Sequence, residues 1–223
     1  MKGVTIILMK GYDGKSRLSL NQKISMELIE ALASDLYFTV SETETCKEPW
    51  DYFIATPDKT FSKQCAKNNI SIIDLMPGEL NSILHQIQHW AVKKSYDALI
   101  LCAGDIPLLT GVLMDFIKKK LFLGLAKKGK SIVICPSKND GVSIIAMSPA
   151  NLWTITSEKG VNNLKVIEGL DREKYPYQIM NDFRAYLDLD HHEDLFSAYK
   201  IMEKNPDYEN RLSKKILGEI LTM

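Results

Sequence analysis

Short apolar runs alternate along the chain with longer stretches whose apolar residues recur at helical spacing. The short runs predict buried strands, and the longer stretches predict amphipathic helices that each pack one face on a sheet. Strands are expected at residues 4–9, 52–56, 70–75, 98–103, 132–135 and 142–147. Helices are expected at residues 21–36, 61–67, 79–92, 112–125 (as one helix or two), 192–204 and 212–221.

The alternation of strands and helices predicts an α/β fold with a doubly wound, mostly parallel sheet that includes one antiparallel strand from the late half. We expect a single domain over residues 1–223, with 206–223 as a C-terminal helical extension that packs on the body or on a partner subunit. Residues 184–189 alternate as a strand would, whereas 156–169 predict a loop-rich excursion. Within it, 156–163 predict a lid that orders on binding, because they combine glycine, asparagine and charge.

The composition of the chain limits the classes of binding partner that we expect. Lys and Arg number 28 against 28 Asp and Glu, so no global field attracts nucleic acid or an acidic membrane, and anion binding must be local. The apolar opening is too short for a signal peptide and no window reaches the length of a membrane span, which predicts a cytoplasmic protein. The three lysines at 118–120 are interpreted as a solvated helix face.

The cysteines and paired histidines are not expected to bind metal. Without a C-x-x-C pair the cysteines are expected to be reduced, and two of them fall in predicted strands. His85 and His89 have the spacing of zinc ligands in helices, but a third ligand is lacking nearby, so we interpret them as an exposed helix face. The four cysteines are Cys46, Cys65, Cys102 and Cys135.

The strand at 98–103 ends in Gly104, Asp105 and Pro107, which places a carboxylate at the strand's carboxyl end. Ligands bind at that edge of an open α/β sheet, and a divalent metal that carries phosphates takes oxygen ligands. Asp105 is therefore a candidate metal ligand. The alternative is that Asp105 caps the following turn.

A basic loop with two glycines, KGYDGKSRLS, follows the first strand directly. Gly11 and Gly14 permit backbone geometries that bring amides toward a ligand, while Lys10, Lys15 and Arg17 can neutralise phosphate oxygens. The loop is interpreted as a phosphate site or as a solvated basic turn.

A second acidic cluster lies in the segment AYLDLDHHEDL. Asp188 and Asp190 lie two residues apart, so on an extended strand both carboxylates point to one face and attract a cation. Alternatively, Asp190 is the N-cap of the next helix, with Glu193 reaching back as in a capping box.

Four blocks together resemble a known family. They are K-x-x-x-x-KSRLS at 10–19, ELNSIL at 79–84, CAGDIPLLT at 102–110 and LDLDHHEDL at 187–195. In this order they resemble the MobA-like, GT-A type nucleotidyltransferases, and within these the 2-phospho-L-lactate guanylyltransferases called CofC. The resemblance implies an enzyme of coenzyme F420 biosynthesis that joins GTP or another nucleoside triphosphate to a small phosphorylated acid, such as 2-phospholactate or phosphoenolpyruvate, and releases pyrophosphate. The alternatives are a GT-A-type transferase with a sugar or molybdopterin acceptor, and an inactive nucleotide-binding paralogue.

The resemblance also implies roles for individual residues and leaves a homodimer open. Lys15, Arg17 and Asp105 are implied to be catalytic, and Asp105 with Asp188 or Asp190 to bind Mg²⁺. The implied nucleotide-binding residues are Lys10, Gly14, Lys15, Arg17, Asp58 and Asn81, and the implied acceptor-binding residues are Gly141, Ser143 and Lys159. The chain departs from the family on the acceptor side: NDGVSIIAM stands where the family has GGTNAL, and TSEKGVNN occupies the interval of a later family segment.

Overall fold

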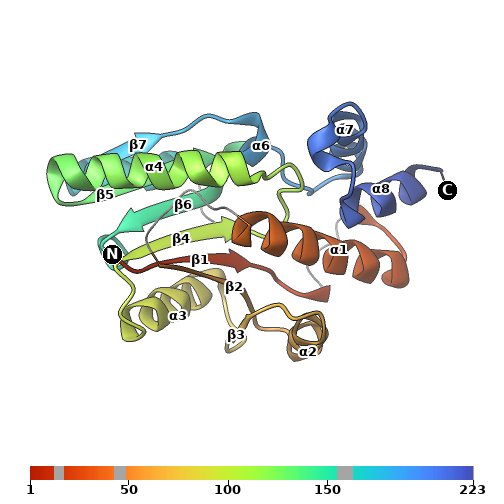
Figure 1. The fold of residues 1–223 in the computed structure, drawn as a ribbon, viewed down its shortest axis with the longest axis horizontal. Coiled ribbons are helices and arrows are strands. Elements are labelled where there is room, and N and C mark those ends of the chain that lie inside the picture. The colour runs from red at the N-terminus through yellow and green to blue at the C-terminus, as the bar shows by residue number, and fades with distance from the viewer. Residues whose placement is uncertain (13–17, 43–48, 155–162, 223) are drawn as a thin grey trace.

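A seven-stranded mixed sheet forms the centre of the protein in a computed structural model that describes residues 1–12, 18–42, 49–154 and 163–222 (Figure 1). The strand order is β3-β2-β1-β4-β6-β5-β7. Every pairing is parallel except those of β6, which runs antiparallel to β4 and to β5. The predicted mostly parallel sheet with one antiparallel strand from the late half is therefore confirmed. The strands are β1 (Gly3–Leu8), β2 (Trp50–Thr56), β3 (Ile72–Asp74), β4 (Ala98–Ala103), β5 (Ser131–Pro136), β6 (Val142–Ser148) and β7 (Tyr177–Ile179).

Helices cover both faces of the sheet, as a doubly wound fold requires. One apolar layer joins the sheet to α1, α4, α7 and α8, and the other joins it to α3 and α5. Figure 1 shows α1 and α4 lying across the first of these faces. The α-helices are α1 (Gln22–Ser41), α2 (Lys59–Lys67), α3 (Leu80–Lys93), α4 (Gly111–Lys128), α5 (Asn163–Arg172), α6 (Phe183–Tyr186), α7 (His192–Glu203) and α8 (Leu212–Thr222), with short 3-10 turns η2 (Lys138–Asp140) and η3 (Pro206–Tyr208).

The apolar run at 98–103 forms the central strand. β4 lies between β1 and β6, and its first five residues are buried. Cys102 and Cys135 are buried in β4 and β5 with free thiols, as expected, and burial is the main cause that raises the pKa of both.

Two predictions in the late half are wrong. Residues 183–186 form helix α6 instead of a strand, because the Asp182 carboxylate accepts a hydrogen bond from the backbone N–H of Arg184 and also pairs with its guanidinium. Residues 163–169 belong to helix α5 instead of a loop, because Val166 and Leu170, four residues apart, bury one side of that helix. Residues 156–162 lie outside the described residues, so the lid remains a prediction.

Lys118 contradicts the interpretation of the lysine run as a solvated face. Lys119 and Lys120 are exposed, but Lys118 is 0% exposed and lies on the apolar side of α4. Its Nζ donates to the Tyr52 hydroxyl at 3.1 Å and stands 5.1 Å from the centre of the Trp50 ring. The aromatic rings and the hydroxyl accommodate the ammonium where water is excluded.

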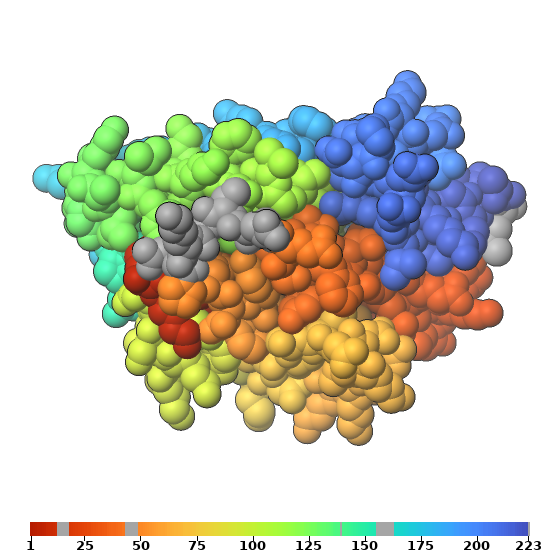
Figure 2. Space-filling view, in the orientation of Figure 1, coloured from red at the N-terminus to blue at the C-terminus, as the bar shows by residue number. Residues whose placement is uncertain are grey.

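The C-terminal helix packs on the body of the same chain. α8 contacts α1 and α7, and Figure 2 shows the C-terminal residues in blue against the orange and green surface of α1 and α4. Asp35 on α1 accepts hydrogen bonds from the backbone N–H groups of Leu212 and Ser213 at 3.1 and 2.8 Å. A side chain of the first helix therefore caps the last one. Among the helices of the described residues, none is long and apolar enough to cross a membrane.

Candidate active site

A cavity of about 480 Å³ opens where β1, β2 and β4 end. Leu8 at the end of β1 pairs with Ala55 of β2 and with Ala103 of β4, so the carboxyl ends of these parallel strands form one edge. The apolar part of the cavity wall includes Leu8, Met9, Leu80, Ile83, Leu84, Leu101 and Ile145. Its polar part includes six residues that the sequence nominated: Lys10, Asp105, Gly141, Ser143, Asp188 and Asp190.

Gly104 carries the chain from β4 to Asp105. Its N–H donates to the carbonyl oxygen of Leu8 at 2.9 Å. A Cβ atom on Gly104 would lie 2.4 Å from Met9 Cγ and 2.8 Å from that carbonyl oxygen, so only glycine fits between the two strand ends. The close approach holds Asp105 at the cavity edge.

The second acidic segment lies beside Asp105. Leu189 N–H donates to the carbonyl oxygen of Asp105 at 3.0 Å, although eighty-four residues separate the two along the chain. Leu187 and Leu189 are buried, while the alternating Asp188 and Asp190 reach the cavity wall. The expected alternation of side chains is present, but the segment is extended chain outside the sheet rather than a strand.

The negative charges of Asp105, Asp188 and Asp190 repel one another on the cavity wall, which costs electrostatic free energy. Burial raises the pKa of Asp188 to about 6, and the charges of Asp105 and Asp190 contribute to the same shift, while hydrogen bonds from its own backbone and from Ser137 oppose it. Asp188 Oδ1 is buried and has no hydrogen-bond partner. An ionised acid with an unpaired buried oxygen beside two others fits a hard divalent cation such as Mg²⁺. Among the described residues, no three His, Cys, Asp or Glu side chains are arranged to hold a metal by themselves, so a cation here would need further oxygens from water or a nucleotide.

Asp194, which the sequence did not single out as a site residue, orders the segment that carries Asp190. Its Oδ2 accepts from the N–H groups of Asp190 at 3.1 Å and His191 at 2.7 Å, and its Oδ1 lies 2.6 Å from Lys138 Nζ. Burial would raise the pKa of Asp194, but Lys138 and these two backbone donors outweigh it and lower the pKa. The alternative interpretation in which Asp190 and Glu193 cap α7 is therefore wrong: the N-cap residue is His191, and Asp194 completes the capping box. The signal was present in the sequence as an acid three residues after His191.

The loop after β1 is held in place by Asp58. Gly11 has φ +86°, and a Cβ atom there would lie 2.3 Å from Asp58 Cβ. Tyr12 N–H donates to Asp58 Oδ2 at 3.0 Å, while Asp58 Oδ1 accepts from Thr60 N–H at 2.8 Å as the N-cap of α2. Asp58 thus joins the start of the basic loop to the end of β2.

The other predicted nucleotide-binding residues differ in whether they lie on the cavity wall. Lys10 lines the cavity. Asp58 and Asn81 lie next to wall residues, Pro57 and Leu80, but are not part of the wall themselves. Gly14, Lys15 and Arg17 fall outside the described residues.

The predicted acceptor-binding residues Gly141 and Ser143 form a further part of the cavity wall. Ser137 N–H donates to the carbonyl oxygen of Gly141 at 2.9 Å and closes a turn in which Asp140, not Gly141, has the left-handed φ of 58°. The Ser143 hydroxyl donates to the carbonyl oxygen of Cys135 at 3.0 Å, so this side chain is oriented by β5. Lys159 falls outside the described residues.

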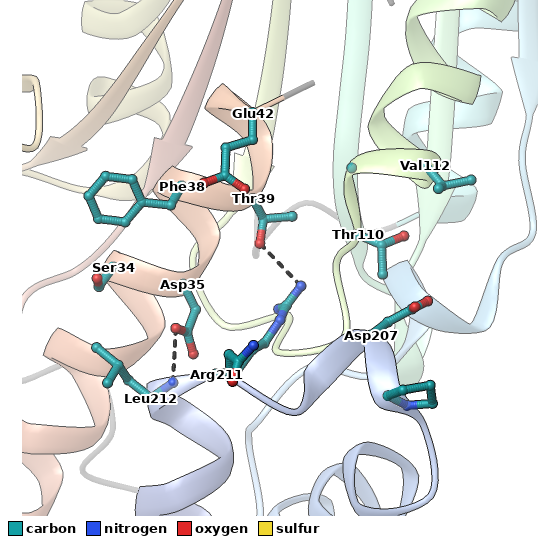
Figure 3. A pocket seen from close by; sticks show the side chains of 13 residues that line it. Ser34, Asp35, Phe38, Thr39, Glu42, Thr110, Val112, Asp207, Arg211 and Leu212 are labelled. Atoms are coloured by element: carbon teal, nitrogen blue, oxygen red, sulfur yellow. Dashed lines mark hydrogen bonds between the residues drawn. The ribbon is translucent and has the colours of Figure 1, made fainter. Parts of the chain in front are cut away.

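A second cavity, of about 700 Å³, lies between α1, the start of α4 and the start of α8 (Figure 3). None of its lining residues is among the predicted site residues. Arg211 donates there to Thr39 Oγ1 at 3.1 Å and to the carbonyl oxygens of Pro107 and Leu109, and Asp35 accepts from Leu212 N–H. These hydrogen bonds attach the C-terminal helix to the rest of the chain. The cavity therefore lies at a structural contact between the two.

The architecture is shared with solved structures of known proteins. A solved structure named for nucleotide-diphospho-sugar transfer, from Desulfovibrio desulfuricans G20, is similar with a TM-score of 0.80 at 16% identity, over 99% of this chain and 95% of that one. A cytidylyltransferase from Leptospira borgpetersenii is similar with a TM-score of 0.59 at 15% identity, over 99% of this chain and 93% of that one. The chain has the fold of the nucleotidyltransferases, as predicted.

Its sequence identifies the family within that class. Residues 4–216 match the family described as guanylyl transferase CofC like, and the chain belongs to it. A curated relative, 2-phospho-L-lactate guanylyltransferase of Methanocaldococcus infernus, is 30% identical over 112 residues, 50% of this chain and 49% of the relative. The chain thus matches about half the length of that curated relative. The family match confirms the resemblance drawn from the four sequence blocks.

Proposed function

We propose that this protein is a magnesium-dependent guanylyltransferase that joins GTP to a small phosphorylated acid and releases pyrophosphate. Family membership and the curated relative support nucleotidyl transfer as the reaction. The observation that carries the proposal is the meeting of Asp105, Asp188 and Asp190 on the wall of one cavity at the carboxyl edge of the sheet. That position is where ligands bind in open α/β sheets.

The reaction is a substitution at phosphorus. A phosphate oxygen of the acceptor attacks the α-phosphorus of GTP, the new P–O bond forms, and the bond from the α-phosphorus to the bridging oxygen of the β-phosphate breaks. Pyrophosphate takes the electron pair of the broken bond. Such catalysis consists mainly of positioning and of charge stabilisation.

The chain's residues supply those two contributions. Asp105 and the segment with Asp188 and Asp190 would hold Mg²⁺, which supplies positive charge to the phosphate oxygens in the transition state. Lys10 lies on the cavity wall and can bind a phosphate oxygen. Lys15 and Arg17 are proposed to bind the triphosphate from the adjoining basic loop.

The acceptor is proposed to be a phosphorylated acid such as 2-phospholactate or phosphoenolpyruvate. The support is the name of the curated relative and the position of Gly141 and Ser143, the residues that the resemblance implies for the acceptor, on the wall of the same cavity. A homodimer remains a prediction.

Binding and turnover should be measured separately. Calorimetry with GTP, ATP, CTP and UTP in the presence of Mg²⁺ should show a preference for GTP. Pyrophosphate release across a panel of phosphorylated acids, sugar phosphates and molybdopterin, followed by mass spectrometry, should identify a guanylylated phospho-acid. GTP binding without turnover on any acceptor would overturn the proposed activity, and turnover only on a sugar phosphate or pterin would overturn the proposed acceptor.

The basic loop is tested by one substitution. Arg17→Ala should raise the KM for GTP and lower kcat, because a guanidinium that binds phosphate in the ground state and in the transition state contributes to both. Ser19→Ala, in the same loop but without a cation, is the control. Unchanged GTP affinity and turnover in Arg17→Ala would remove Arg17 from the site.

A further inference from the structure

The segment that carries Asp188 and Asp190 is positioned by contacts other than strand pairing. It lies outside the sheet, so the hydrogen bonds of a strand ladder do not hold it. Its backbone N–H groups form hydrogen bonds that position it: Leu189 N–H donates to the carbonyl oxygen of Asp105, and the N–H groups of Asp190 and His191 donate to Asp194 Oδ2. Three nearby carboxylates repel one another in the absence of a cation, which favours movement of this segment.

Asp194 could not hold the segment without a cation of its own. Its side chain is 0% exposed, and a buried carboxylate that is not paired is costly. Lys138 Nζ, 2.6 Å from Asp194 Oδ1, supplies the compensating charge and remains 38% exposed. The charges of Glu193 and Asp188 also act on Lys138, so the ammonium lies near the acidic segment as a whole.

Lys138 does not line the cavity itself but joins the acidic segment to a turn that does. It begins the short turn η2, between Ser137 and Gly141, which both line the cavity on the acceptor side. Ser137 also hydrogen-bonds Asp188. Two neighbouring residues of the turn therefore reach across to the acidic segment, and fifty-six residues separate Lys138 from Asp194 along the chain.

We infer that Lys138 is a positioning residue: its ion pair with Asp194 joins the acceptor-side turn to the Asp188–Asp190 segment, so that acceptor and metal are held in register. This role rests on the proposed nucleotidyl transfer. Lys138 acts through Asp194 and does not touch the nucleotide. Because the pair spans the acceptor wall and the metal segment, its loss affects the acceptor and Mg²⁺ and leaves nucleotide binding nearly unchanged.

The substitutions separate charge from packing. Lys138→Met keeps the length of the side chain and removes the charge, and Lys138→Arg restores a cation. Asp194→Asn keeps an oxygen for the two backbone donors and replaces the one that faces Lys138. Lys200→Met on α7, where the lysine forms an exposed pair with Glu203 at 3.4 Å, is the matched control.

Kinetics should show a specific pattern. In Lys138→Met the KM for the acceptor and the Mg²⁺ concentration for half-maximal turnover should each rise, with kcat/KM for the acceptor falling by roughly 10-fold to 100-fold. At saturating Mg²⁺ the KM for GTP should change by less than about 2-fold, since Lys138 does not touch the nucleotide. Lys138→Arg should recover most of the loss. Asp194→Asn combined with Lys138→Met should be no worse than the single variants, because both remove the same contact.

Two readouts do not depend on turnover. Hydrogen exchange of residues 187–192 in the metal-free protein should be faster in Lys138→Met than in the wild type and in Lys200→Met. Mn²⁺ binding, followed by electron paramagnetic resonance with a non-hydrolysable GTP analogue, should weaken in the same variant. Unchanged exchange and unchanged Mn²⁺ binding would overturn the inference. A lower unfolding temperature with normal acceptor KM and Mg²⁺ dependence would also overturn it, because the pair would then be structural only. Wild-type protein without turnover would overturn the proposed function alone, since exchange and Mn²⁺ binding would still decide the role of Lys138.

Discussion

At the scale of single residues, the candidate site brings three carboxylates, Asp105, Asp188 and Asp190, to the wall of one cavity. Asp188 Oδ1 is buried without a hydrogen-bond partner, and two further carboxylates face the same cavity. Two other carboxylates each have a cationic partner: Asp182 pairs with Arg184, and Asp194 pairs with Lys138. The buried, unpaired oxygen of Asp188 on a cavity wall supports a functional role for that residue.

Asp105→Asn tests that role directly. The substitution keeps the shape of the side chain and removes its charge, so turnover should fall by roughly 10²-fold to 10³-fold, on the order of 3 to 4 kcal/mol of transition-state stabilisation. Thermal stability of the metal-free protein should stay the same or rise, because one source of repulsion is lost. Magnesium-dependent turnover and thermal unfolding measure both effects, with the exposed Asp207→Asn as control. Full activity in Asp105→Asn would favour the alternative that Asp105 only caps a turn, since Asn caps about as well as Asp.

The raised pKa of Asp188 predicts a dependence of stability on pH. The pKa of Asp188 is about 6 in the folded protein against an ordinary value of 3.8, so the folded state binds this proton more tightly than the unfolded state. The ionised side chain therefore destabilises the metal-free fold increasingly as pH rises from about 4 to about 6, and fully above that range. Asp188→Asn should raise the unfolding temperature more at about pH 8 than at about pH 4, in the presence of a chelator.

The same measurement with Mg²⁺ and GTP is the control. A bound cation compensates the charge of Asp188, so the stabilising effect of Asp188→Asn at high pH should disappear. An equal effect of the substitution at both pH values would show that Asp188 does not carry the raised pKa.

At the scale of elements, predictions succeeded where burial alone decides the structure. The apolar runs became β1, β2, β4, β5 and β6 within about two residues of the expected bounds, because continuous apolar runs of that length have few other stable solutions. The three-residue strand β7 is too short to produce such a pattern. Helix α5 was missed because glycine and asparagine outweighed the spacing of its buried positions.

The three carboxylates on the cavity wall could be nominated from the sequence, but the contacts that hold them could not. Asp105, Asp188 and Asp190 could be nominated because carboxylates follow predicted extended segments. The hydrogen bond from Leu189 to Asp105 and the ion pair between Lys138 and Asp194 join positions far apart in sequence, and their residue types alone do not indicate the pairing. Lys118 was misjudged for a similar reason, since only the packed structure brings Trp50 and Tyr52 beside it.

Asp58 connects two elements, so its carboxylate has two functions. Substitutions of Asp58 can separate these functions. Burial would raise the pKa of Asp58, but backbone N–H groups of Phe61, Tyr12 and Thr60 outweigh it and lower the pKa. Asp58→Asn can keep the cap of α2 with its remaining oxygen, while its amide N–H₂ group faces the Tyr12 N–H and loses that bond. We expect the KM for GTP to rise several-fold with stability changed by less than about 1 kcal/mol.

The comparison variant for this test is Asp58→Ala, which loses the cap as well. It should show the same rise in KM and an additional loss of about 1 kcal/mol in the free energy of unfolding. If Asp58→Asn had wild-type kinetics while Asp58→Ala were destabilised, Asp58 would act only as a helix cap and the loop would be positioned by other contacts.

At the scale of the whole molecule, the antiparallel strand β6 explains why the cavity has two walls. β1, β2 and β4 end at one edge of the sheet, whereas β6 begins at that edge and brings Val142 and Ser143 to it from the opposite direction. The acidic segment returns to the same edge from the C-terminal part of the chain. Residues far apart in sequence thus surround one cavity, and the helices that connect them lie on the two faces of the sheet.

The C-terminal helix is the last element placed against this body, and its attachment can be tested without touching the cavity. Asp35→Ala removes the acceptor for the N–H groups of Leu212 and Ser213 and for the Ser213 hydroxyl. Loss of such a cap should cost about 1 to 2 kcal/mol, which lowers the unfolding temperature by roughly 2 to 8 °C in a chain of this size. GTP affinity should be unchanged, because α8 lies on the face of α1 and not on the cavity wall. Asp35→Asn, which keeps one oxygen, should lose less. Light scattering on the same variants adds the decisive control: unchanged unfolding together with an altered oligomeric mass would mean that α8 serves a partner subunit rather than its own chain.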